Sequence, residues 1–268
     1  MNVFHILVFQ PVYNLVIFFA DIFPGANFGL AIVSATLLIK LLFLSLSKKQ
    51  IESQKQMQEI QPKIKQIQER FKDDKERQSK EIMSLYKDSG VNPFMGCLPM
   101  VIQIIFLIAI YRVILSISDT GFTPAPEELY GFIKNPGSLY KVFLFTDLAV
   151  PSIVFAVIAA AGQFYQTKML MISNKTNNET KTDVKAGHKH KKNEEEKPKE
   201  ADFAAMMNQQ MLYLGPAMTL FIGLKFPAAL SLYWLVSTVF AIIQQRFILK
   251  EKKANAETMN DVRKKSAQ

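Results

Sequence analysis

Long apolar stretches with almost no charge alternate along this sequence with short blocks in which the charged residues are concentrated. Five stretches hold at most one charge each: 28–47, 93–118, 150–173, 206–224 and 226–249. A bilayer core about 30 Å thick requires roughly 20 helical residues, and backbone polar groups within lipid must be satisfied inside the helix. The pattern therefore predicts an all-α integral membrane protein with five transmembrane helices, of which 206–224 carries the weakest signal.

Residues 1–27 are apolar but interrupted by Gln10, Pro11, Asn14 and Asp21. They lack the basic start and the small-residue cleavage site of a signal peptide. We expect an amphipathic helix that lies at the membrane interface, with a sixth transmembrane span as the alternative.

The basic residues fall on one side of a five-span chain. The chain has 32 Lys and Arg against 23 Asp and Glu, a net charge of +9. Segments 48–92, 174–205 and 250–268 carry 11, 8 and 6 basic residues, whereas loop 119–149 carries two and the short connection at Lys225 one. Positive charge in membrane proteins concentrates on the cytosolic side, so we expect the N-terminus outside and the C-terminus in the cytosol.

The cytosolic segment 48–92 is predicted to be a helical hairpin, with Pro62 kinking or restarting its first arm. Apolar residues recur there at spacings of three and four, as on one face of a helix. They are Met57, Ile60, Ile64 and Ile67. The two arms packing together explain this pattern, and a docking face for partners is a further interpretation of the same residues.

The other two cytosolic segments differ from the hairpin. Residues 174–205 contain few large apolar residues and are predicted to be a disordered linker. Residues 250–268 are predicted to be a flexible basic tail, suited to anionic lipid or ribosomal RNA.

Lys40 is the strongest single functional signal. It lies 12 residues into the first span, about 18 Å from one end and about 10 Å from the cytosolic end. A lone ammonium at such a depth costs on the order of 2.5–3.5 kcal/mol, and the other spans contain no acidic residue to pair with it. Two explanations stay open: its stem reaches up to the cytosolic headgroups, or it faces a water-filled cavity.

Polar residues form stripes at helical spacing on four of the spans, which favours a hydrated groove over a sealed bundle. The candidate groove residues are Thr36, Lys40, Gln103, Gln163, Ser231, Trp234 and Thr238. Ser and Gln also hold membrane helices together, and Trp234 also fits an aromatic anchor at the interface.

Hydrolytic chemistry is not indicated. The sequence has no H-E-x-x-H, G-x-S-x-G or Walker A motif, and a single cysteine, Cys97. We expect no enzyme activity, no cofactor and no metal site.

Several stretches resemble the YidC/Oxa/Alb family of membrane protein insertases, in a short bacterial form. The most specific is LYKDSGVNPFMGCLPMVIQ at 85–103. Others are the single cation of the first span followed by KKQ at 48–50, MQEIQPK at 57–63, and FPAALSLYW at 226–234 leading to IIQQRFIL at 242–249.

The resemblance implies a five-helix membrane core with an outer amphipathic helix, a cytosolic hairpin and a basic tail. It implies a groove open to cytosol and lipid, with Lys40, Gln163 and Trp234 at the family's groove positions. The implied partners are nascent membrane proteins, the Sec translocon and the signal recognition machinery. The bilayer and, through the basic tail, the ribosome are expected as further partners. The family usually has Arg where this chain has Lys40, and Lys is a more compact point charge.

We therefore expect a non-enzymatic insertase and chaperone of the bacterial inner membrane. A small-solute transporter or channel is the alternative, although the two halves of the sequence show no inverted repeat.

Overall fold

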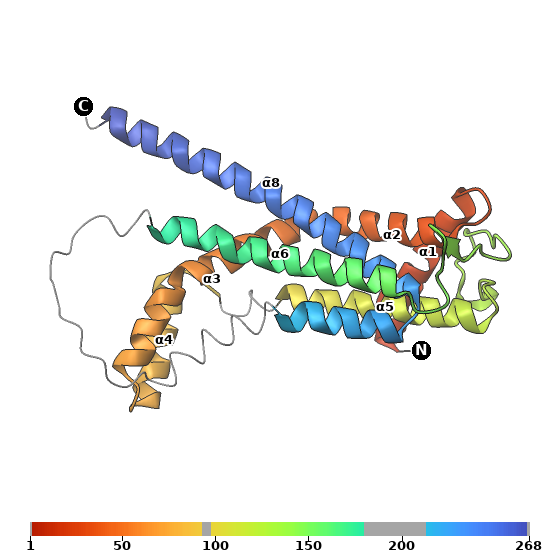
Figure 1. Cartoon of the computed structure of the whole chain (residues 1–268), viewed down its shortest axis with the longest axis horizontal. Helices are drawn as coiled ribbons and strands as arrows, with labels where there is room; N and C mark the ends of the chain where they lie inside the picture. Colours follow the sequence, from red (N-terminus) through yellow and green to blue (C-terminus); the bar gives the residue numbers. More distant parts are fainter. Residues whose placement is uncertain (1, 93–97, 180–212, 267–268) are drawn as a thin grey trace.

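The protein is an elongated helical bundle with a helical hairpin at one end and an irregular connection at the other (Figure 1). The computed structural model describes residues 2–92, 98–179 and 213–266. Its elements are η1 (His5–Phe9), α1 (Gln10–Ile22), α2 (Phe28–Leu42), α3 (Leu44–Arg70), α4 (Lys75–Asp88), α5 (Leu98–Asp119), η3 (Pro126–Glu128), β1 (Val142–Phe143), β2 (Thr146–Asp147), α6 (Ile153–Glu179), a helix over 213–225, and α8 (Ala228–Ser266).

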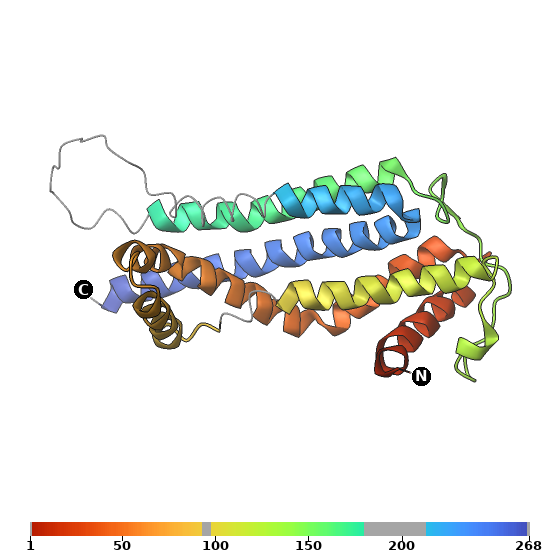
Figure 2. The same ribbon diagram turned by 90° about the horizontal axis from the view of Figure 1, so that it is seen from below.

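Both views show α2, α5, α6, α8 and helix 213–225 running side by side (Figures 1 and 2). The α3–α4 hairpin projects beyond one end of this bundle, here called the hairpin end. The connection between α5 and α6 covers the opposite end, here called the loop end.

Three helical segments in the described part are long and apolar enough to cross a bilayer: His5–Ile22, Val101–Asp119 and Ala228–Ile248. The bent pair α2 and α3 would add a fourth. The chain is thus an all-α multi-pass membrane protein, as the sequence predicts. The count of five spans stays a prediction, because 206–212 lie outside the described residues.

The first predicted span, 28–47, is not one straight helix. The helix ends at Leu42, and α3 begins at Leu44 with a bend of 65°. Phe43, at the bend, packs edge-on against Phe106 of α5 with ring centroids 5.7 Å apart. At this contact the chain turns away from the bundle. The bend could not be predicted from the sequence, because residues on both sides of it are apolar.

The predicted cytosolic hairpin is present as α3 and α4, which contact each other. Asp74 caps α4 by accepting a hydrogen bond from the Arg77 amide at 2.9 Å. However, α3 does not restart at Pro62 but continues through it to Arg70. Proline removes one backbone donor, and strong helix formers on both sides maintain the helix here.

Two segment boundaries differ from the sequence-based prediction. Helix α6 continues to Glu179, six residues into the predicted linker, and the remainder of that linker, 180–205, lies outside the described residues. Helix α8 continues to Ser266, so the tail predicted to be flexible is helical over nearly its whole length. Its Lys, Glu and Ala residues have high intrinsic helix propensity, which the interpretation based on charge alone neglected.

Helix α1 runs obliquely to the bundle (Figure 2). Asn14, only 3% exposed, donates to the Glu128 carbonyl at 2.8 Å and accepts from the Tyr130 amide at 2.7 Å. The Tyr13 hydroxyl accepts from the Ala125 amide at 2.8 Å. Asn14 and Tyr13 therefore bind α1 to the connection between α5 and α6, while the interfacial position of α1 stays a prediction.

The closely packed core lies toward the loop end. On α2 the buried residues stop at Thr36, on α5 they occupy only 109–117 among the described side chains, and on α6 only 155–160. The largest wholly buried side chains are Tyr13, Phe28, Ile17, Ile32, Ile110, Ile114 and Ile117. Toward the hairpin end, the described side chains of α2, α5 and α6 are at most partly buried, whereas α8 still has Gln245 and Ile248 buried.

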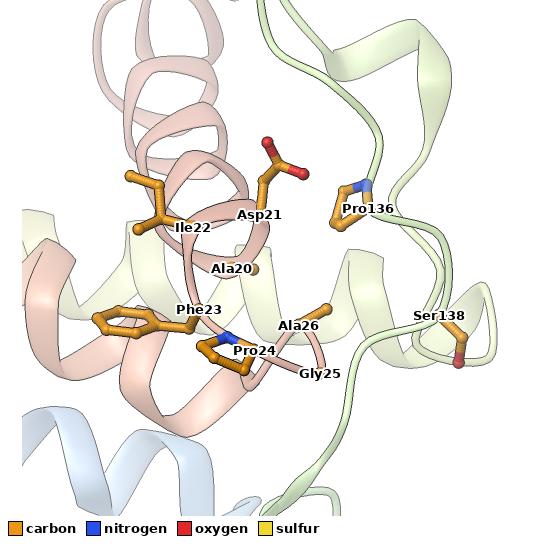
Figure 3. Close-up of a pocket in the computed structure, with 9 residues that line it drawn as sticks. All are labelled: Ala20, Asp21, Ile22, Phe23, Pro24, Gly25, Ala26, Pro136 and Ser138. Carbon is orange, nitrogen blue, oxygen red and sulfur yellow. The ribbon is translucent and has the colours of Figure 1, made fainter.

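The loop end also holds a pocket of about 510 Å³, between the end of α1 and residues 136–138 (Figure 3). Figure 3 shows a lining of small and apolar residues with one carboxylate, that of Asp21. It is distant along α2 from Lys40 and is not part of the site described below.

Helix 213–225 comes close to both α6 and α8 at Gly223. A Cβ atom there would lie 2.7 Å from the Ala156 Cβ and 2.9 Å from the Ser231 hydroxyl oxygen. At Gly162 of α6, a Cβ would lie 3.4 Å from the Thr238 methyl, an ordinary contact.

We expect Gly223→Ala to lower the free energy of unfolding by about 1–3 kcal/mol, because the added methyl group meets backbone-proximal atoms that cannot yield. Gly162→Ala is the matched control and should be neutral or stabilising, since alanine favours helix and the space is adequate. Thermal melting of the two purified variants in detergent measures the difference, and equal melting temperatures would contradict this account of the packing.

Candidate functional site

Lys40 lies near the hairpin-facing end of α2 and points toward α5. Its ammonium donates a hydrogen bond to the Gln103 side-chain oxygen at 3.2 Å, and the Gln103 amide donates to the Tyr233 hydroxyl at 3.4 Å. Three helices, α2, α5 and α8, thus contribute one polar side chain each to a single chain of hydrogen bonds. The amide accepts from the cation with its oxygen and donates with its nitrogen, which is the polarity that a positive charge requires.

These hydrogen-bonded side chains lie where the closely packed core at the loop end gives way to the partly buried helices of the hairpin end. Tyr233 is 3% exposed, whereas Lys40 and Gln103 are partly exposed. From Leu37 to Lys49 no side chain of α2 or α3 is buried, and none is buried from Val101 to Ile108 of α5. The Lys40 ammonium is therefore bonded to Gln103, and the residue as a whole keeps part of its surface exposed.

Gln163 lies on α6 and pairs across to the neighbouring helix. Its side-chain oxygen accepts a hydrogen bond from the Thr219 hydroxyl, and a Cβ at Gly215 would lie 3.0 Å from its nitrogen. The sequence-based candidate Gln163 therefore joins α6 to helix 213–225, and within the described part of the chain no hydrogen bond connects it to Lys40.

The remaining candidates are mostly buried in helix contacts. Thr36 is 1% exposed and donates its proton to the Ile32 carbonyl at 2.6 Å. Ser231 and Thr238 are each 4% exposed on α8, and Trp234 between them is partly exposed. Lys40, Gln103 and Trp234 thus retain accessible surface, whereas Thr36, Ser231 and Thr238 lie within the packing.

The sequence analysis missed two residues that complete these contacts, Tyr233 and Thr219. Tyr233 directly precedes Trp234 in FPAALSLYW, and a tyrosine within an apolar span must find a partner for its hydroxyl group. This need for a hydrogen-bond partner could have identified Tyr233 from the sequence. A second missed contact joins α8 to α6, where the Arg246 guanidinium donates to the Tyr165 hydroxyl and lies 5.6 Å from the centre of its ring.

The apolar seam of the helical hairpin is largely covered. Ile60 is 7% exposed, and Met57, Ile64 and Ile67 are partly buried. Helix α3 contacts both α4 and α5. Packing within the chain therefore accounts for much of the seam, and its use as a docking face stays a prediction.

Comparison with known proteins defines the class. The sequence profile of the family described as "60Kd inner membrane protein" matches residues 18–256. A relative from Bacillus anthracis named "Membrane protein insertase YidC 2" is 33% identical, with 89% of this chain and 78% of the relative covered.

Two further relatives are named "Membrane protein insertase YidC". The protein from Streptomyces avermitilis is 32% identical, with 91% of this chain and 56% of the relative covered. The one from Rickettsia massiliae is 31% identical, with 91% of this chain and 39% of the relative covered. The chain thus spans about half or less of these two longer relatives.

Together with the apolar helices, these matches define a multi-pass bacterial inner membrane protein. The chain belongs to the YidC/Oxa/Alb family, as its motifs indicate.

We expect Gln103→Met to lower the melting temperature more than Tyr233→Phe does. The first change removes a hydrogen bond to a cation, a class whose net contribution is about 1.5–3 kcal/mol, whereas the second removes only a long neutral bond. Both substitutions conserve volume approximately, so thermal melting of the detergent-purified variants compares the two bonds. An equal or reversed order would show that Gln103 does not support the Lys40 charge.

Proposed function

We propose that this protein is a membrane protein insertase, which moves nascent membrane proteins from the cytosol into the bilayer. The observation that carries the proposal is the position of Lys40 and Gln103. They form a polar pair between α2 and α5, on the half of the bundle where these helices are only partly buried, while the opposite half is filled by large apolar side chains.

In the proposed mechanism, water enters from the hairpin end as far as the Lys40 level and stops at the packed core. The hydrated groove shortens the apolar path that a polar substrate segment must cross. Lys40 attracts the acidic part of that segment, and the apolar part leaves sideways into lipid past α2, α6 and α8. The protein binds and solvates the substrate and makes no covalent bond to it, so no cofactor or metal is needed.

The expected size of the effect follows from transfer energies. A charged side chain at the centre of a bilayer costs about 2.5–3.5 kcal/mol on insertion scales. If the groove solvated one such side chain fully, the rate would rise by about 70- to 400-fold, since each 1.36 kcal/mol is a factor of ten. One groove cation is therefore sufficient for a large effect on acidic substrates.

The loop end is proposed to lie outside and the hairpin end in the cytosol, with the C-terminus cytosolic. The excess of basic residues in 48–92, 174–205 and 250–268 supports this orientation. In this orientation the α3–α4 hairpin and the basic end of α8 meet the ribosome and anionic lipid. The Sec translocon and the signal recognition machinery are further proposed partners, on the family resemblance alone.

A small-solute transporter or channel is the alternative considered on the sequence. The relatives are named insertases, which does not favour it.

We expect Lys40→Ala to reduce insertion of a single-span substrate with an acidic outer tail, and Lys40→Glu to reduce it further by repulsion. Lys40→Arg should retain most activity, because it keeps the charge. Protease protection of the tail in liposomes containing the purified protein measures insertion.

Lys168→Ala is the matched control, since Lys168 is an exposed cation on α6 and its loss changes net charge equally. Insertion that falls as much for Lys168→Ala as for Lys40→Ala would contradict a local role of the Lys40 charge. Insertion no better than in empty liposomes with wild-type protein would contradict the proposed function.

A further inference from the structure

A short β-hairpin at the loop end, with two residues in each strand, carries large apolar side chains at its tip. Strands β1 and β2 pair Phe143 with Thr146, which leaves Leu144 and Phe145 as the turn. Both have positive φ, 45° and 69°. Turns of this kind favour Asn and Gly, because a larger side chain meets its own backbone in this conformation.

The packing of the described chain does not explain these residues. Phe145 is 102% exposed and Leu144 is 67% exposed, so neither side chain is covered. The strands that carry this tip are joined by an ion pair.

Lys141 pairs with Asp147 at 2.8 Å. Partial burial by itself raises the pKa of the Asp147 carboxyl, but the bond from Lys141, the Ala149 amide and the Lys141 charge together hold it below its usual value.

The base of the β-hairpin is fixed to the ends of the bundle helices. Tyr140 exchanges backbone hydrogen bonds of 3.0 Å with Ala26 and Phe28 at the start of α2. The Phe143 ring lies so close to Gly29 that a Cβ there would be 2.5 Å from it. At the other side, the Ala229 amide at the start of α8 donates to the Leu148 carbonyl at 3.1 Å. The tip is thus held at the level where the membrane helices begin (Figure 1).

Exposed apolar side chains continue from the β-hairpin into the helix that follows it. Val150, Ile153 and Val154 are 51%, 65% and 58% exposed, and α6 begins at Ile153. In a membrane protein these side chains at the start of a bundle helix face lipid. The tip therefore extends the apolar surface of the bundle at the loop end.

From this arrangement we propose that Leu144 and Phe145 insert into the bilayer leaflet at the loop end, at the boundary between headgroups and acyl chains. Aromatic side chains favour this level of the membrane, and the tip offers no hydrogen-bonding side chain to a protein partner. Insertion anchors the start of α2 through Phe143 and Gly29. The proposal requires that the bundle crosses a membrane, and it does not depend on the insertase activity.

The test places an environment-sensitive fluorophore on Phe145→Cys in a Cys97→Ser background, with the full chain in lipid nanodiscs. The matched control carries the probe on Lys134→Cys, an exposed position in the same connection. We expect the probe at 145 to be quenched by lipids bearing a nitroxide at a shallow acyl position and protected from iodide. The probe at 134 should show the opposite pattern.

A second variant adds Leu144→Asp to the labelled Phe145→Cys chain, and we expect its probe to become accessible to iodide. Equal iodide quenching at 145 and 134 would overturn the proposal. Protection from iodide that appears only in native membranes, without quenching by nitroxide lipid, would identify a protein occupant and would overturn it as well.

Discussion

The amine of Lys40 must remain solvated although its helix is otherwise apolar, and the surrounding structure meets this constraint. The carboxamide of Gln103 supplies one acceptor, and the Tyr233 hydroxyl completes the chain of hydrogen bonds. An amide partner leaves the positive charge uncompensated, unlike a carboxylate. In the proposed mechanism this charge is available to a substrate and is solvated by water that enters from the hairpin end.

The packed loop end of the bundle matters as much to the proposed mechanism as the less packed hairpin end. Large side chains from α1, α2 and α5 fill the loop end, and Asn14 and Tyr13 bind α1 to the connection between α5 and α6. A polar segment that entered as far as Lys40 would meet a packed barrier ahead of it and lipid beside it. The proposed mechanism therefore has the substrate leave sideways into the bilayer and not pass to the other side, as a channel substrate would.

The pattern of apolar residues along the sequence was sufficient to predict the membrane class and the helical hairpin. Helices buried in lipid are apolar over their whole length, and helices that pack on each other have apolar residues every three or four positions. Spacing along the sequence also selected Lys40 and Gln103. It did not pair them, since the approach of α2 to α5 is a property of the packing. The bend at Phe43 and the pairing of Gln163 with Thr219 were missed for the same reason. The helical tail of α8 was missed because charge was weighed above helix propensity.

The most direct test of the account is the water accessibility of α5 on either side of the boundary. Gln103→Cys and Ile114→Cys, each in a Cys97→Ser background, would be treated with a membrane-impermeant maleimide from either face of sealed vesicles. The account predicts that position 103 reacts from the cytosolic face only and that position 114, whose side chain is 1% exposed, reacts from neither. A position 103 that is unreactive from the cytosolic face, or equally reactive from both faces, would contradict a hydrated half closed at the loop end.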